Sequence, residues 1–105
     1  MTAENGSPAH PDRGDVDRRI TQIRERMTDL DSRLVALLNE RARCAREIGQ
    51  LKETVGLAVY QPQREIEVLS HVRSQNGGPL EADAITRLFE RIIDEARRLE
   101  RSSQR

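Results

Sequence analysis

One arginine interrupts an otherwise apolar series in the first half of the sequence. Apolar residues recur at alternating spacings of three and four from Ile20 to Leu51, and Arg41 stands where another is expected. Lys52 follows eleven residues later, which is about 1100° of helical turn, so the two cations face nearly the same side. A cation among apolar neighbours is costly unless an anion meets it there. The spacing therefore predicts a local binding site for an anionic group.

Each of the polar residues also has an ordinary explanation. Lys52 is favourable near a helix C-terminus, and a lone polar residue such as Arg41 can fix the register and oligomeric state of packed helices. Arg64 and Glu65 stand at the start of a predicted second helix, and Glu100 stands at the edge of the apolar face of a third. Such positions are often exposed, so no single one of these residues indicates a function.

A long helix is predicted around Arg41 and Lys52. The apolar series predicts a helix from about Val16 to Thr54, capped by Asp15 or Asp17 and ended by Gly56. At about 1.5 Å per residue this helix is close to 60 Å long, too long for a chain of this size to bury alone. We therefore expect a partner along its whole length, and a second copy of the chain is the simplest one.

Two shorter helices are predicted after it. Residues 57–60 form a short apolar turn that we expect to pack down, and Pro62 suits the first position of a helix that fades by Ser74. Turn residues at 75–79 separate this helix from a third one, which starts at Leu80 and has a broad apolar face. The predicted fold is all-α, with one long and two shorter helices.

Length and charge balance narrow the functional classes. The 105 residues suit one helical domain at 16–101, between a flexible tail at 1–15 and a flexible end at 102–105, with no room for a regulatory domain. With 18 basic and 18 acidic residues, and one Phe and one Tyr, nucleic-acid binding is disfavoured. No apolar run is long enough to cross a membrane, and we expect a cytoplasmic protein.

Few residues offer metal or nucleophilic chemistry. The two histidines, His10 and His71, and the single Cys44 make a site for a metal unexpected. Cys44 lies on the apolar series, so we interpret it as a small core residue and not as a nucleophile. We expect neither a metal nor a cofactor.

The polar residues nevertheless follow a specific order and spacing. The sequence contains Arg24-x6-Asp31-x9-Arg41-x10-Lys52, then Tyr60-x-Pro62-x-Arg64-Glu65, and finally Ile92-Ile93-x-Glu95-x3-Leu99-Glu100. This series resembles the all-helical chorismate mutases over roughly residues 18–101, and the spacing from Arg24 to Glu65 needs no gap.

The resemblance implies an intertwined homodimer whose long helices run antiparallel and whose two active sites are each built mostly by one chain. The catalytic residues that it implies are Arg41, Lys52 and Glu100, and the substrate-binding residues are Arg24, Arg64, Glu65 and Gln61. Glu65 would accept a hydrogen bond from the substrate hydroxyl, and Glu100 would lie at the ether oxygen. Arg24 would reach the site of the other chain, since it is 28 residues from Lys52, about 42 Å along a continuous helix.

The implied reaction is the rearrangement of chorismate, a dianion, to prephenate in aromatic amino acid biosynthesis by the shikimate pathway. It is an intramolecular pericyclic step, so it requires no nucleophile, metal or cofactor. The barrier falls when the enolpyruvyl side chain is held over the ring and when negative charge on the ether oxygen is stabilised. Arginines suit the first task because their forked donors bind carboxylates in two places, and Lys52 suits the second.

Three residues depart from the family pattern. Glu100 stands where glutamine is usual, and a glutamate donates a hydrogen bond only when it is protonated, so we expect it to act as the neutral acid. Gln61 replaces a common aspartate and can still cap the second helix. Ala96 replaces a frequent serine, which removes a contact near a substrate carboxylate.

Two other functions stay open at this point. Isochorismate-pyruvate lyase is a sister activity on the same scaffold, is also pericyclic and uses a similar cationic pocket. A helical dimerisation module without catalysis is the third reading. In that case replacing Arg41 with leucine would stabilise the dimer at no functional cost.

Overall fold

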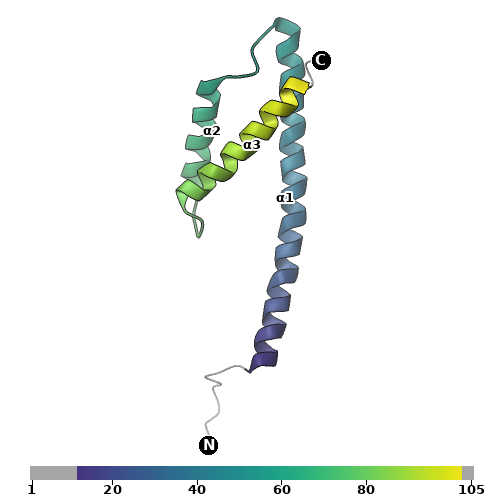
Figure 1. Cartoon of the computed structure of the whole chain (residues 1–105), viewed down its shortest axis with the longest axis vertical. Coiled ribbons are helices and arrows are strands. Elements are labelled where there is room, and N and C mark those ends of the chain that lie inside the picture. Colours follow the sequence, from purple (N-terminus) through teal and green to yellow (C-terminus); the bar gives the residue numbers. More distant parts are fainter. Residues whose placement is uncertain (1–11, 103–105) are drawn as a thin grey trace, which may run out of the picture. The chain divides into compact units, whose positions relative to one another are not determined.

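The computed structural model describes residues 12–102, which form three α-helices (Figure 1). Helix α1 spans Arg13–Val55, α2 spans Pro62–Gln75 and α3 spans Ala82–Ser102. The described residues contain no strand, so the predicted all-α fold is confirmed. Residues 1–11 and 103–105, which make up most of the predicted flexible ends, lie outside the described part. None of the three helices is long and apolar enough to span a membrane.

Both ends of α1 are set by short-range chemistry. The helix begins at Arg13, ahead of the predicted Val16, because Asp12 caps it in place of Asp15 or Asp17. The Asp12 carboxylate accepts a hydrogen bond at 2.7 Å from the backbone N–H of Asp15, which has no partner within the helix. At the other end, Gly56 stops the helix as predicted. Its φ of 70° lies in the left-handed region that glycine adopts without a steric penalty.

The chain divides into two compact units, residues 1–36 and residues 37–105. Apart from Asp12, the described part of the first unit belongs to α1, and all of its described residues are exposed. Its apolar series has exposed fractions of 38–55%, at Val16, Ile20, Ile23, Met27, Leu30 and Leu34. These apolar side chains are uncovered in the single chain.

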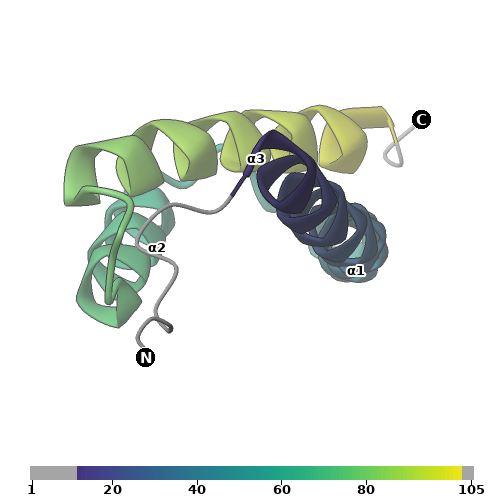
Figure 2. The ribbon, with the colours of Figure 1, turned by 90° about the horizontal axis from the view of Figure 1, so that it is seen from below.

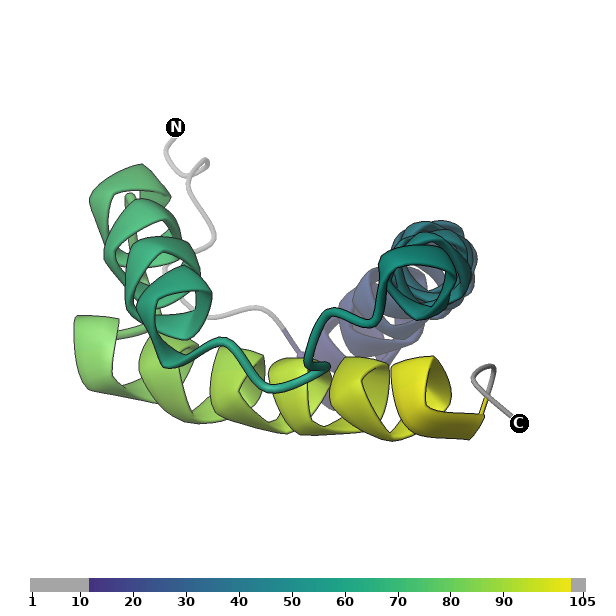
Figure 3. The ribbon, with the colours of Figure 1, turned by 90° about the horizontal axis from the view of Figure 1, so that it is seen from above.

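The second unit contains the end of α1 together with α2 and α3. Helices α2 and α3 pack against each other, and Figures 2 and 3 show this pair from opposite ends. In Figure 3, α2 and the end of α1 lie on the same side of α3. The buried residues are few and mostly small: Ala45 and Gly49 on α1, and Ile93 on α3. The turn at 57–60 packs down only at Val59, which is half-buried, so the prediction for this turn is largely wrong.

Candidate functional site

A cavity of about 330 Å³ lies in the second unit, with walls from all three helices. Its cationic side chains are Arg41, Lys52, Arg64 and Arg97, and its carboxylates are Glu65 and Glu100. When all six are ionised, the wall has an excess of two positive charges. A volume of this size suits a small organic ligand, and the charge excess suits a ligand with two negative charges.

Helix α1 supplies two of the cations. Arg41 and Lys52 both line the cavity, so the prediction that they share one side of the helix is confirmed. Arg41 is half-buried, and among residues 12–102 no carboxylate forms an ion pair with it. Its guanidinium is therefore available to an anionic ligand, with donors spaced to bind a carboxylate in two places.

Lys52 is held from two directions. Its Nζ forms an ion pair with Glu100 Oε2 on α3 at 3.1 Å, and it donates a hydrogen bond to the carbonyl of Val59 at 3.2 Å. The two charged side chains are only 12% and 14% exposed, so each compensates a charge that would be costly alone. Since an ammonium group has three donors, one N–H of Lys52 remains for a ligand in the cavity.

Arg97 also lines the cavity, although it was not among the residues predicted for the site. Its Nη2 donates to Glu65 Oε2 on α2, and its guanidinium carbon lies 4.9 Å from the centre of the Tyr60 ring. Its spacing from Glu100 could have predicted this position. Residues three apart lie on the same face of a helix, so Arg97 and Glu100 lie on the same side of α3. It was overlooked because no member of the recognised series stands at this position.

Three further cavity residues differ in how firmly they are held. Arg64 pairs with Glu67 at 3.5 Å, but both side chains are more than half exposed, and such pairs are worth only about 0.2–1 kcal/mol. Gln61 lies at the N-cap of α2 without a side-chain capping bond, so the predicted cap is wrong, and its side chain borders the cavity instead. Cys44 is exposed and also borders the cavity, which corrects its interpretation as a core residue.

The cavity thus brings together six of the seven residues predicted for the site. Those six are Arg41, Lys52, Arg64, Glu65, Gln61 and Glu100, and Ala96 lies beside them. Arg24 is the exception. It lies in the first unit, is exposed and is absent from the cavity wall. Its predicted contribution to the site of another chain stays a prediction.

Comparison with known proteins points to one family. Residues 23–101 match the family model described as chorismate mutase type II. The bifunctional chorismate mutase/prephenate dehydratase of Neisseria gonorrhoeae is 38% identical over 86 residues, which are 82% of this chain and 23% of that protein. The protein of the same name from Pseudomonas aeruginosa is 37% identical over 87 residues, 78% of this chain and 24% of that protein. The chain therefore spans about a quarter of the length of these relatives.

A solved structure of similar length gives the same result. Form II of chorismate mutase from Thermus thermophilus superposes with a TM-score of 0.78 at 35% sequence identity. The match covers 79% of this chain and 94% of that one. Form I of the same protein gives a TM-score of 0.73, again at 35% identity, over 74% of this chain and 98% of that one.

The ion pair between Lys52 and Glu100 predicts a measurable stability difference. Lys52→Met leaves the Glu100 carboxylate in a partly buried place without its cation, and we expect the free energy of unfolding to fall by about 1–3 kcal/mol. Glu67→Gln breaks the exposed pair with Arg64 and should change it by less than about 1 kcal/mol. Urea denaturation measures both values. Equal losses in the two variants would contradict the compensation described above.

Proposed function

Because the chain belongs to the chorismate mutase type II family, we propose that it catalyses the rearrangement of chorismate to prephenate. The observation that carries this proposal is the cavity of about 330 Å³ with its excess of two positive charges. Chorismate is a small molecule with two carboxylates, so it matches the cavity in size and in charge. Its reaction needs positioning and electrostatic stabilisation, and these polar side chains can supply both.

Arg41 and Arg64 are the residues that we assign to the substrate's carboxylates. Lys52 and Arg97 are each engaged by a part-buried carboxylate. Within residues 12–102, by contrast, Arg41 has no such partner and Arg64 pairs only with the exposed Glu67. Two arginines that bind the two carboxylates of the substrate would hold the enolpyruvyl side chain over the ring. Restricting a flexible reactant in this way lowers the entropic part of the barrier.

Lys52 and Glu100 are assigned to the ether oxygen. Negative charge develops on this oxygen as the C–O bond breaks, and the remaining N–H of Lys52 can donate to it. Glu100 can donate only as the neutral acid. In the structure its Oε2 forms an ion pair with Lys52 Nζ at 3.1 Å, so both groups lie at the same part of the cavity. We propose that Glu100 works as the neutral acid in the complex with the substrate and donates a hydrogen bond to the ether oxygen.

We further propose that the active form is a homodimer with antiparallel long helices. The uncovered apolar series of the first unit supports this, because exposed apolar rows of this length mark interaction surfaces. A second hollow in the other unit is lined mainly by apolar groups, among them Leu38, Ile92 and Leu99, and could receive part of another chain. In this dimer Arg24 would complete the site of the other chain. A cytoplasmic location and a place in aromatic amino acid biosynthesis belong to the same proposal.

The direct test is the loss of chorismate absorbance when the purified chain is added, with prephenate identified as the product. Arg41→Leu should lower kcat by about 100-fold or more because it removes a cation from the substrate. It should leave stability unchanged or raised, since an apolar side chain replaces a half-buried charge.

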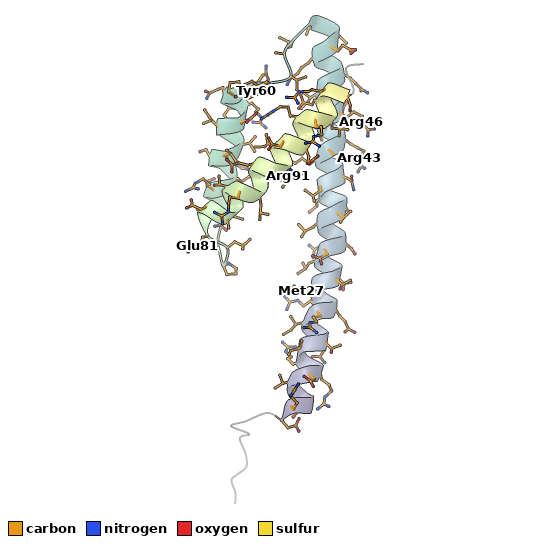
Figure 4. The ribbon with its side chains drawn as sticks, in the orientation of Figure 1. Met27, Arg43, Arg46, Tyr60, Glu81 and Arg91 are labelled. Atoms are coloured by element: carbon orange, nitrogen blue, oxygen red, sulfur yellow. The ribbon has the colours of Figure 1, made fainter. Side chains whose placement is uncertain are left out.

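Arg46→Leu is the matched control, since Arg46 is exposed and absent from the cavity wall. Figure 4 shows it on the same helix, α1. We expect it to retain turnover. Pyruvate and salicylate formed from isochorismate, with chorismate left intact, would instead identify a lyase. Full turnover in Arg41→Leu would support a scaffold role for this arginine and contradict the assignment.

The proposed protonation of Glu100 predicts a dependence on pH. Wild-type turnover should fall as pH rises, because the glutamate loses the proton that it must donate, whereas Glu100→Gln should give a flatter profile. Glu90→Gln, which changes an exposed carboxylate on the same helix, should keep the wild-type profile. The measurement is kcat/KM across pH for the three proteins. Identical profiles for wild type and Glu100→Gln would refute the neutral-acid role.

The shared site predicts complementation between inactive variants. Arg24→Ala and Arg41→Ala, unfolded and refolded together, should regain about a quarter of wild-type activity, because half of the dimers are mixed and each has one intact site of two. Arg41→Ala mixed with Lys52→Ala is the control. Both of these changes fall in the site built by one chain, so no dimer has an intact site. Equal recovery in both mixtures would exclude a contribution of Arg24 across the interface.

A further inference from the structure

We propose that Arg97 is a positioning residue that holds Glu65 in place as the acceptor for the substrate hydroxyl. This inference rests on the proposed function and adds a residue outside the recognised series. The observation behind it is a bridge of three elements: Arg97 on α3, Glu65 on α2, and Tyr60 in the segment that joins α1 to α2. Figure 4 shows Tyr60 close to the start of α2.

The contacts divide the two oxygens of Glu65 between two tasks. Arg97 Nη2 donates to Oε2, and this contact leaves Oε1 to accept from a ligand. A glutamate side chain has three rotatable bonds, so without an anchor its carboxylate would adopt many orientations. Arg97 removes this freedom before the substrate arrives, and such preorganisation favours binding of one defined geometry.

The negative charge of Glu65 also requires Arg97 as a partner. A carboxylate in a cavity that receives a dianion repels the ligand, and Glu65 is only 28% exposed, so water screens it poorly. Pairing with Arg97 makes the two side chains neutral as a unit while the acceptor atom is preserved. The excess of two positive charges then stays with the residues assigned to the substrate's carboxylates.

Arg97 is itself confined on several sides. Its side chain is 22% exposed, its guanidinium carbon is 4.9 Å from the Tyr60 ring centre, and its Nη1 lies 3.8 Å from Asp94 Oδ1. The ring attracts the cation on one face, and Glu65 accepts a hydrogen bond from its Nη2. Asp94 adds an electrostatic attraction at 3.8 Å without a hydrogen bond. The orientation of Glu65 therefore depends on the place of α3 and on the Tyr60 segment, and not on α2 alone.

A double-mutant cycle in kcat/KM tests this role. Arg97→Met should lower kcat/KM for chorismate about 10- to 100-fold, the usual range for a lost hydrogen bond to a charged group. In the Glu65→Gln background the same change should cost less than about 3-fold, because Arg97 acts through Glu65. A chorismate analogue without the ring hydroxyl should likewise be turned over almost equally by wild type and Arg97→Met.

Controls separate positioning from folding. Arg97→Lys keeps the charge and should recover part of the loss, and Arg91→Met, which breaks an exposed pair with Glu95 on the same helix, should change nothing. Melting temperatures of all variants report any loss of fold. An equal loss from Arg97→Met in both backgrounds, or no loss at all, overturns the inference while the proposed function stands. Absence of chorismate turnover in the wild type overturns the proposed function, and this inference with it.

Discussion

Charge compensation between helices is the constraint on which the rest of the second unit depends. Its buried residues are few, and among the described residues no large side chain is completely buried. Two ion pairs of low exposure, Lys52 with Glu100 and Arg97 with Glu65, connect α3 to α1 and to α2. Charged groups that are largely removed from water require such partners. The same pairs that hold the helices therefore also form the wall of the cavity.

Because these ion pairs both connect the helices and line the cavity, the cavity can contain many charged groups without destabilising the protein. Each carboxylate of the cavity wall neutralises one of its cations, and the wall's other two cations are the half-buried Arg41 and the exposed Arg64. A dianionic substrate would bring the site close to neutrality. Binding and charge compensation are then the same physical event, which suits an enzyme whose reaction requires electrostatic stabilisation and no nucleophile.

The exposed apolar residues of α1 support a role in dimerisation, which is separate from the role of the cavity in binding the substrate. A helix packed within its own chain would bury such a row, whereas here the side chains from Val16 to Leu34 stay exposed. Arg24, which is proposed to complete the site of another chain, lies on the same helix in the first unit. Dimerisation and completion of the site are therefore linked in the proposed function through one element, α1.

Several features followed from the sequence because their causes are local. Apolar spacing predicted the three helices, Gly56 and Pro62 predicted two of their ends, and the eleven-residue spacing predicted that Arg41 and Lys52 lie on one side. The series of polar residues identified six residues of the cavity wall. The cap at Asp12 was missed because aspartates compete for this position within a few residues, and each satisfies the same rule.

Only the tertiary structure decided which charges meet. Glu65 and Arg97 are 32 residues apart, and Lys52 and Glu100 are 48 apart, so no periodicity within one helix could pair them. Likewise, the place of Cys44 on the apolar series predicted burial, but packing of α1 leaves it exposed at the cavity. The sequence by itself determined the helices and the faces on which their side chains lie. Their pairing depends on how the helices pack, because electrostatic compensation acts across space and not along the chain.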